Sequence, residues 1–206
     1  VVTALAKVVT VPISIDTSKA AVARAALDAG AVLVNDVTAL RGDPAMVDVV
    51  ARAGAGVVLM HMQGMPRTMQ HAPHYDDVLG EVSAFFEERI RFAIAHGIAR
   101  RQIILDPGIG FGKLLEHNLA LLAQLFRFHQ FDCPLLVGVS QKGFLGQILD
   151  RPVLERQWGT AAAVALAVDR GAEILRVHDV RAMKDVVQVA AAMSRETIVS
   201  RKAQHA

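Results

Sequence analysis

The segment Leu105-Asp106-Pro107-Gly108-Ile109-Gly110-Phe111-Gly112-Lys113 decides how we interpret the fold. It continues the apolar run 103–105, and Pro107 removes a backbone N–H donor, so a buried strand is expected to end at Asp106. The three glycines let the backbone approach a ligand closely or adopt positive φ angles. A carboxylate beside bare N–H groups, an aromatic ring and a cation makes this segment a candidate small-molecule site.

Two common glycine motifs do not fit this segment. A phosphate-binding P-loop has a glycine six residues before its lysine and Ser or Thr after it, but Pro107 and Leu114 occupy those positions. The dinucleotide-binding fingerprint G-x-G-x-x-G fails because the spacing here is G-x-G-x-G. A tight turn between strand and helix with no ligand stays open at this point, so the other strand ends have to decide.

Short apolar runs alternate with segments of helical spacing along the rest of the chain. The other runs are 11–15, 31–34, 57–60, 135–137 and 174–175, and helical spacing is present near 18–29, 44–53, 79–93, 121–128, 161–168 and 183–190. Continuous rather than alternating apolar strands are typical of a parallel sheet buried on both faces, as in a (β/α) barrel or a doubly wound sheet. A full barrel needs eight strands and typically ~250 residues. Because we count six strands and the chain opens in what resembles a helix tail, we expect an α/β fold, a TIM (β/α)8 barrel without its first two strand–helix units.

Composition indicates one globular domain. Of 206 residues, 53% are hydrophobic and 20% charged, and the net charge of +2 is too small to indicate a nucleic-acid partner. Cys133 is the single cysteine, which excludes an internal disulfide and suits the reducing cytoplasm. No apolar run is long enough to cross a membrane. We expect a cytoplasmic protein with one domain over 1–193 and a polar tail over 194–206.

Polar residues follow the strands at the point where each one ends. They are Asp16, Asn35-Asp36, His61, Asp106, Arg176 with His178, and, two residues after the fifth strand, Ser140-Gln141-Lys142. Barrel enzymes bind ligands at the carboxyl ends of their strands, with phosphate groups near the last two. The cations here belong to the last two strands, and the acidic and amide residues to earlier ones. This order predicts a pocket that accepts hydrogen bonds from a donor-rich heterocycle on one side and holds a phosphate or pyrophosphate on the other.

Each of these residues also has an ordinary structural interpretation. Asp16 with Thr17 could cap a helix, Asn35-Asp36 could form a turn, and His61 among methionines is better explained as a packed side chain than as a ligand. Arg176 and His178 are harder to explain in this way, because a buried charge without a partner is costly. Six independent coincidences at six strand ends are improbable together. No H-x-x-x-H, C-x-x-C or G-x-S-x-G spacing supports a His/Cys metal site or a serine hydrolase.

Six segments, taken in order, resemble the dihydropteroate synthase family. They are Ile15-Asp16-Thr17, Val34-Asn35-Asp36-Val37, Leu59-Met60-His61-Met62-Gln63-Gly64, Asp106 to Lys113, Gly138-Val139-Ser140 with Lys142, and Arg176-Val177-His178-Asp179-Val180. The resemblance extends from the start of the chain to about Met193. It implies a folate-biosynthesis transferase on a TIM barrel that joins p-aminobenzoate to 6-hydroxymethyl-7,8-dihydropterin diphosphate and releases pyrophosphate. It also implies Mg²⁺ as cofactor, sensitivity to sulfonamides and a homodimer when full length.

The resemblance assigns roles to positions of this sequence. It implies pterin binding by Asp16, Asn35, Asp106 and Lys142, diphosphate binding by Arg176 and His178, and a wall for the p-aminobenzoate ring at Phe111. Lys142, Arg176 and His178 form the expected catalytic set, and Thr17, Met60, Gly110 and Gly143 complete the expected substrate-binding set. No metal ligand is expected in this chain, because the family's metal-binding asparagine belongs to an earlier segment.

This sequence departs from the family pattern in two respects. The usual Ser-Arg-Lys-Ser is Ser140-Gln141-Lys142-Gly143, so Gln141 lacks a fixed cation and Gly143 lacks the hydroxyl that lies near the p-aminobenzoate carboxylate in the family. We therefore predict weaker p-aminobenzoate binding and an altered sulfonamide response. The family's opening segments, N-V-T-P-D-S-F-S-D-like and G-G-E-S-T-R-P-like, are not in this sequence, so we expect a truncated chain that alone binds pterin poorly and turns over little.

Two alternatives stay open. One is a non-catalytic pterin-binding paralogue or fragment, which Gln141 and Gly143 make conceivable. The other is the methyltetrahydrofolate-binding domain of a corrinoid methyltransferase, against which Phe111-Gly112-Lys113 and Arg176-Val177-His178 argue.

Overall fold

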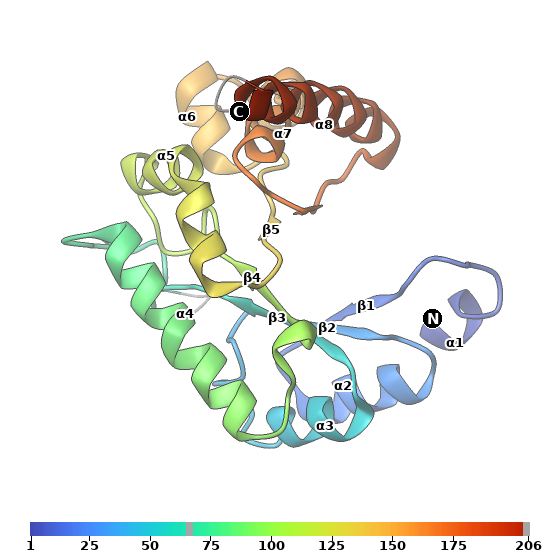
Figure 1. The fold of residues 1–206 in the computed structure, drawn as a ribbon. Helices are drawn as coiled ribbons and strands as arrows, with labels where there is room; N and C mark the ends of the chain where they lie inside the picture. The colour runs from blue at the N-terminus through green and yellow to red at the C-terminus, as the bar shows by residue number, and fades with distance from the viewer. Residues whose placement is uncertain (65–67, 204–206) are drawn as a thin grey trace.

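The structure is a computed structural model that describes residues 1–64 and 68–203, with side chains through residue 194. Parallel strands alternate with helices along the chain (Figure 1). The strands are β1 (Ser14–Asp16), β2 (Leu33–Asp36), β3 (Gly56–Met60), β4 (Ile103–Asp106), β5 (Leu136–Val137) and β6 (Ile174–Leu175). The α-helices are α1 (Val2–Leu5), α2 (Ala20–Asp28), α3 (Met46–Ala53), α4 (Val78–Ala95), α5 (Leu115–Ala123), α6 (Gly143–Leu149), α7 (Gln157–Asp169) and α8 (Val180–Ala203), and the 3₁₀ helices are η1 (Arg100–Gln102), η2 (Leu125–Phe131) and η3 (Val153–Glu155).

The strands follow one another in chain order. The sheet β1-β2-β3-β4 is parallel throughout, β5 pairs with β6 in parallel, and a bridge between Leu105 and Leu135 joins the two sheets. Helices α2, α3 and α4 lie one after another along the outer side of β1–β4, and α6, α7 and α8 group together beyond β5 (Figure 1). Within the described residues β6 does not pair with β1, so the sheet stays open. The predicted α/β fold with six parallel strands of an incomplete barrel is confirmed.

The core lies between the strands and the helices that cover them. Leu59, Leu105 and Leu135, on or next to neighbouring strands, are fully buried beneath Phe86 of α4 and Phe128 of η2. The two rings meet edge to face at 5.4 Å between centroids, an arrangement that aromatic pairs prefer. This core holds the strand ends in a defined register.

Several elements differ from the sequence-based expectation, beginning with the first strand, which is expected over 11–15 and spans Ser14–Asp16. The helix expected near 121–128 is divided into α5 and η2, because Gln124 between them leaves helical geometry at φ −118°. Helix α6 was not predicted, since its short sequence carries two glycines and no clear apolar period. Residues 194–203 of the predicted polar tail continue α8, and residues 204–206 lie outside the described residues.

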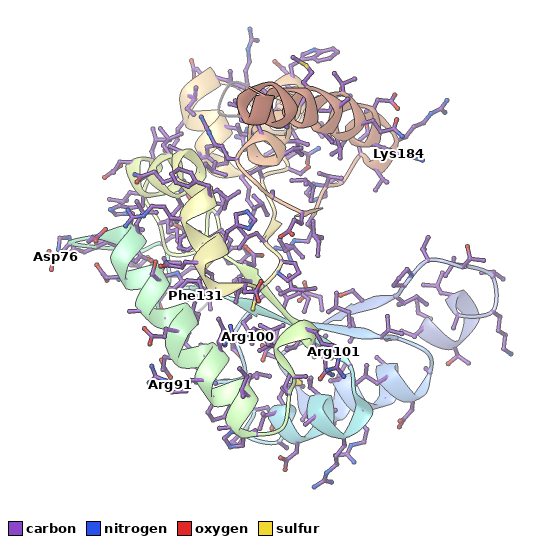
Figure 2. All side chains as sticks on the ribbon, viewed as in Figure 1. Asp76, Arg91, Arg100, Arg101, Phe131 and Lys184 are labelled. Carbon is purple, nitrogen blue, oxygen red and sulfur yellow. The ribbon has the colours of Figure 1, made fainter. Side chains whose placement is uncertain are left out.

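Side-chain contacts connect the loops at the opposite end of the sheet from the predicted site. Arg100 of η1, just before β4, donates a hydrogen bond from Nη1 to the carbonyl oxygen of Phe131 at 2.7 Å (Figure 2). None of the helices among the described residues has the length and apolar character needed to cross a bilayer.

Candidate active site

The carboxyl ends of the strands bring four of the predicted residues together. In the register of the sheet Asp16 is opposite Asn35, and Met60 is opposite Asp106. Asn35 donates from Nδ2 to Asp16 Oδ2 at 2.8 Å. Arg176, which follows β6, extends between the two carboxylates, with Nη1 3.8 Å from Asp16 Oδ2 and Nη2 3.6 Å from Asp106 Oδ2. One cation therefore connects the ends of β1 and β4.

Two buried acceptor atoms at these strand ends have no hydrogen-bond partner within the described residues. They are Asn35 Oδ1 and Asp106 Oδ2. The other oxygen of Asp106 accepts the backbone N–H of Gly108 at 2.8 Å, and only 1% of Asp106 is exposed. Because leaving a buried acceptor unpaired costs about 1–3 kcal/mol, the pair of orphan oxygens indicates a place where a ligand supplies N–H donors.

The electrostatics of Asp106 depend on the cations around it. Burial raises the pKa of Asp106, and the charges of Arg176, Lys142 and Lys113, together with the Gly108 N–H, oppose that rise. Opposite charges nearby favour the ionised form of a buried carboxyl group. Arg176, Lys142 and Lys113 therefore act on the acceptor Asp106 by opposing its protonation.

Lys142 and Phe111 form the next part of the site. The Lys142 ammonium lies 4.0 Å from the centre of the Phe111 ring, within cation–π range. Gly110 has φ +81°, and a Cβ there would lie 3.2 Å from Lys142 Cδ. The absence of a side chain at Gly110 therefore leaves room for the aliphatic part of Lys142. Burial, and then the charge of Arg176, lower the pKa of Lys142.

His178 is fixed by the residue at the end of the neighbouring strand. Ser140 Oγ lies 2.8 Å from His178 Nδ1, and the same oxygen accepts the His178 backbone N–H at 3.3 Å. The structure gives no direct contact between His178 and the Asp106–Arg176 pair among the described residues. Gly143, also predicted for the substrate site, begins α6, and a Cβ there would meet nothing within 4 Å.

Some residues at the strand ends make local structural contacts. Thr17 accepts the Lys19 N–H at 3.1 Å in the turn before α2, whose N-cap, Lys19, has no side-chain cap hydrogen bond, so Thr17 does not form the helix cap considered from the sequence. Asp36 is fully buried and accepts the N–H groups of Thr38 and Leu40, so it closes the loop after β2 while its neighbour Asn35 faces Asp16. Met60 is fully buried and lends the site only apolar surface.

His61 is a packed histidine, as we predicted. Its ring is 6% exposed and lies edge-on to Phe85 at 4.9 Å between centroids. Lys113 Nζ is 2.9 Å from His61 Nδ1. The glycine segment predicts a cation at Lys113, and its burial is a finding of the structure that the sequence did not predict. The signal in the sequence that could have predicted this burial is the position of Lys113 at the end of the glycine segment, where the chain can fold back against the strand.

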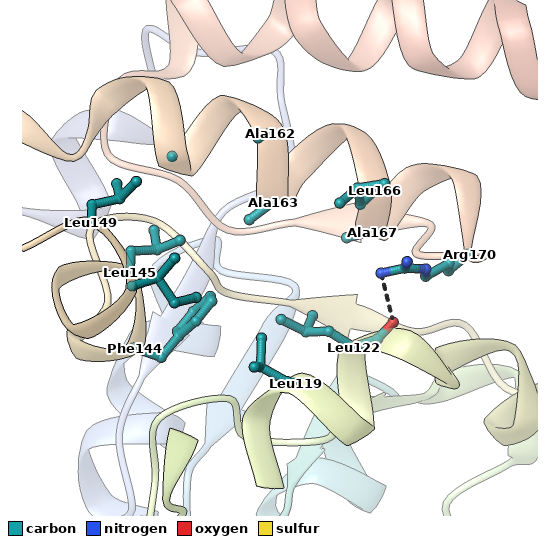
Figure 3. A pocket seen from close by; sticks show the side chains of 12 residues that line it. Leu119, Leu122, Phe144, Leu145, Leu149, Ala162, Ala163, Leu166, Ala167 and Arg170 are labelled. Carbon is teal, nitrogen blue, oxygen red and sulfur yellow. Dashed lines mark hydrogen bonds between the residues drawn. The ribbon is translucent and has the colours of Figure 1, made fainter. Parts of the chain in front are cut away.

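A separate cavity of about 240 Å³ lies between helices α5, α6 and α7 (Figure 3). Its walls are apolar and include Leu119, Leu122, Phe144, Leu145 and Leu166, and Arg170 at its edge donates to the Leu122 carbonyl at 3.5 Å. It holds no acid or orphan acceptor. Its lining includes none of the residues that we predicted for the substrate site.

Comparison with known proteins is consistent with this geometry. The family model described as pterin binding enzyme matches residues 1–178. The curated dihydropteroate synthase of Synechocystis sp. is 46% identical over 196 residues, 95% of this chain and 68% of that protein. The dihydropteroate synthase of Escherichia coli K12 is 47% identical over 189 residues, 92% of this chain and 67% of that protein.

Solved structures show the same similarity in three dimensions. The Yersinia pestis dihydropteroate synthase in complex with a sulfonamide drug superposes with a TM-score of 0.92 at 44% identity, covering 95% of this chain and 71% of that one. The Xanthomonas albilineans enzyme in complex with 7,8-dihydropteroate gives a TM-score of 0.87 at 44% identity, covering 93% of this chain and 70% of that one.

Proposed function

The chain belongs to the pterin-binding enzyme family, and from this premise we propose how its strand ends carry out the reaction of a dihydropteroate synthase. The chain is a transferase of folate biosynthesis, related to enzymes solved with dihydropteroate and with 4-aminobenzoic acid. The reaction joins p-aminobenzoate to 6-hydroxymethyl-7,8-dihydropterin diphosphate and gives 7,8-dihydropteroate and pyrophosphate. The relatives do not favour the alternative of a methyltetrahydrofolate-binding domain.

The pair of orphan acceptors carries the assignment of the pterin site. A pterin ring presents an amino group and a ring N–H along one edge, and the carboxylate of Asp106 can accept two such bonds. Asn35 Oδ1 offers a further acceptor, and Lys142 can donate to the acceptor atoms of the ring. We assign Asp16 to holding Asn35 and Arg176 in place, because it contacts both.

The leaving group belongs on the cationic side. When the C–O bond of the pterin methylene breaks, pyrophosphate departs with the electron pair and positive charge develops on the carbon. Arg176 and His178 are assigned to the diphosphate, where stabilising the developing anion lowers the barrier. The arylamine nitrogen then attacks the carbon and loses a proton. It is already a nucleophile, so the site needs to position it, and Phe111 provides a wall for its ring.

Mg²⁺ is part of the proposal through the family alone. Among the described side chains, those of residues 1–64 and 68–194, no group of three or more His, Cys, Asp or Glu residues could hold a metal ion. We therefore assign no step to Mg²⁺ in this chain. Adding Mg²⁺ to a metal-free preparation, with pyrophosphate release as the readout, tests whether it is required.

Self-association and location are also proposals. On η3 and α7, Leu154 is 90% exposed and Trp158 is 81% exposed, and large apolar side chains this accessible are typical of interaction surfaces. We propose that the chain forms a homodimer through this face and acts in the cytoplasm. Light scattering after size-exclusion chromatography should show a dimer, and Trp158→Lys should yield a monomer.

Ligand titration of Asp106→Asn tests the pterin assignment. The charge-assisted hydrogen bonds at Asp106 predict roughly 100-fold weaker binding of 6-hydroxymethylpterin to the variant in isothermal titration. Asp48→Asn, at an exposed carboxylate on α3, is the matched control. Equal affinity for the wild type and Asp106→Asn would refute the assignment. Titration with the pterin diphosphate and then p-aminobenzoate identifies a non-catalytic paralogue, which would bind the first and ignore the second.

A further inference from the structure

A buried lysine lies behind the glycine segment, and the proposed reaction gives it no contact with a substrate. Lys113 is 4% exposed. Its ammonium lies 2.9 Å from His61 Nδ1, 3.0 Å from the Phe111 carbonyl oxygen and 3.4 Å from the His61 carbonyl oxygen. An ammonium has three N–H donors, so each one has an acceptor. Through these hydrogen bonds the Lys113 side chain connects the glycine segment to His61, the residue that follows β3.

His61 is suited to be a permanent acceptor in this interaction. Burial, and then the charge of Lys113, lower the pKa of His61 to about 2. The ring is therefore uncharged near neutral pH, and its Nδ1 faces the Lys113 ammonium. Phe85 packs edge-on against the ring and holds it in place. The connection between β3 and the glycine segment does not open by protonation of the histidine.

Other contacts fix the same segment from the loop that follows β3. Tyr75 donates its hydroxyl to the Gly112 carbonyl at 2.8 Å, and Gln70 donates to the Gly110 carbonyl at 2.7 Å. A Cβ at Gly108 would collide with the carbonyl oxygen of His61. The backbone at Gly108, Gly110 and Gly112 is therefore held by several contacts, and the ammonium of Lys113 adds a hydrogen bond to the carbonyl oxygen of Phe111 within the same segment.

The charge of Lys113 also acts on Asp106. Its Nζ would lie 3.5 Å from a Cβ on Gly108, the residue whose N–H binds Asp106 Oδ1. The groups that face Asp106 are Arg176, Lys142 and Lys113, and those that face Lys113 are His61, Tyr75, Asp106 and Lys142. Burial lowers the pKa of Lys113 to about 7, so below neutral pH it is a cation inside the protein.

We propose that Lys113 is a positioning residue of the pterin site, which connects the Asp106–Lys113 segment to the end of β3 through its hydrogen bonds and places a buried ammonium that opposes the protonation of Asp106. The inference rests on the proposed function, in which Asp106 accepts hydrogen bonds from the pterin. Lys113 touches no substrate in this scheme. It acts through the backbone beside Phe111 and through the charge state of Asp106.

The pH dependence of pterin affinity distinguishes this role from simple packing. In Lys113→Met, 6-hydroxymethylpterin should bind about tenfold more weakly at pH 6, a loss of ~1.4 kcal/mol. The acid limb of the affinity profile should move to higher pH, because Asp106 loses a cation that opposes its protonation. Lys113→Arg keeps the charge and should retain the profile of the wild type. Lys184→Met, at an exposed position on α8 (Figure 2), is the control.

Hydrogen exchange provides a test without ligand. The amides of residues 108–112 should exchange at least tenfold faster in Lys113→Met, while those of α4 stay as in the wild type. If Lys113→Met does not fold, Lys113→Gln, which keeps a donor without charge, replaces it. An unchanged affinity profile together with unchanged exchange would overturn the inference. If the wild type itself fails to bind the pterin, the proposed function fails, and the exchange measurement alone decides the role of Lys113.

Discussion

The two loops at the predicted substrate site differ in how they are held. The Asp106–Lys113 segment is buried and is fixed by contacts from β3 and the loop after it, including Lys113 to His61 and Tyr75 to Gly112. The Ser140–Gly143 segment is held mainly through the backbone of Gln141, whose N–H binds Thr160 Oγ1 and whose carbonyl accepts Arg156. Gly143 faces open space.

The difference separates two kinds of sequence constraint. A change in the buried segment must be accommodated by several partners, so its effect reaches the acceptor Asp106. A change in the open segment alters the side chains available to contact a substrate and has little effect on the stability of the fold. The pterin acceptor Asp106 belongs to the first kind, and the departures from the family pattern, Gln141 and Gly143, belong to the second.

The largest expected effect is at Arg176, which joins the two loops. It contacts the carboxylates of Asp16 and Asp106, and its Nε would lie 3.2 Å from a Cβ on Gly138, just before the open segment. Arg176→Met should lower the rate of pyrophosphate release roughly 10²–10³-fold through loss of a preorganised donor. Arg52→Met, on the exposed face of α3, should leave the rate unchanged. A loss below threefold would show that the two loops work without this connection.

A matched pair of glycine substitutions tests the comparison directly. Gly108 has φ +66° and no room for a Cβ, so Gly108→Ala should lower the free energy of unfolding by about 3 kcal/mol, from the left-handed backbone plus the collision. Gly143→Ala has open space and should change it by less than ~0.5 kcal/mol, or raise it. Urea denaturation measures both. Equal effects would contradict the distinction between a buried and an open loop.

The pH dependence of stability sharpens the comparison further. Lys113 titrates at about 7 in the fold, against 10.5 for an ordinary lysine, so between these values the unfolded chain binds more protons and stability rises with pH. We expect the free energy of unfolding to increase by about 2 kcal/mol between pH 7 and 9 from this group. In Lys113→Met the slope should shrink, without vanishing, because burial also lowers the pKa of Lys142. A slope as steep as that of the wild type would mean that Lys113 is solvated.

The smallest effect is expected in the open segment. Restoring the family pattern with Gln141→Arg and Gly143→Ser should lower the Michaelis constant for p-aminobenzoate severalfold, because a fixed cation and a hydroxyl return near its carboxylate. Stability and pterin affinity should stay the same. The sulfonamide response, measured as the inhibition constant of sulfamethoxazole, should shift with it. Identical Michaelis constants in both chains would refute the predicted role of these two positions.

Sequence patterns were sufficient for the strands and for most of the helices. Continuous apolar runs are specific to buried parallel strands, and β3 and β4 begin within one residue of the expected positions. Helix α6 and the division between α5 and η2 were missed, because a short helix with two glycines and a break at Gln124 leave no periodic signal.

The same contrast applies to the site. Asp16, Asn35, Asp106 and Arg176, which the structure brings together, were selected from the sequence because each is a polar residue at or just after the end of an apolar strand. The sequence could not distinguish Asp36, which closes a loop, from Asn35, which faces Asp16. Consecutive residues of a strand point in opposite directions, and only the neighbouring strands decide which of the two faces the site.

The sequence by itself determined the family, the alternation of strands and helices, and the set of polar strand ends, because these depend on residue type and spacing along the chain. The tertiary structure alone decided that Asn35 Oδ1 and Asp106 Oδ2 accept no hydrogen bond within the described residues, that Arg176 extends between two carboxylates, and that Lys113 is buried against His61. These are contacts between residues far apart in the chain. Their burial and charge state arise only when the strands are packed side by side.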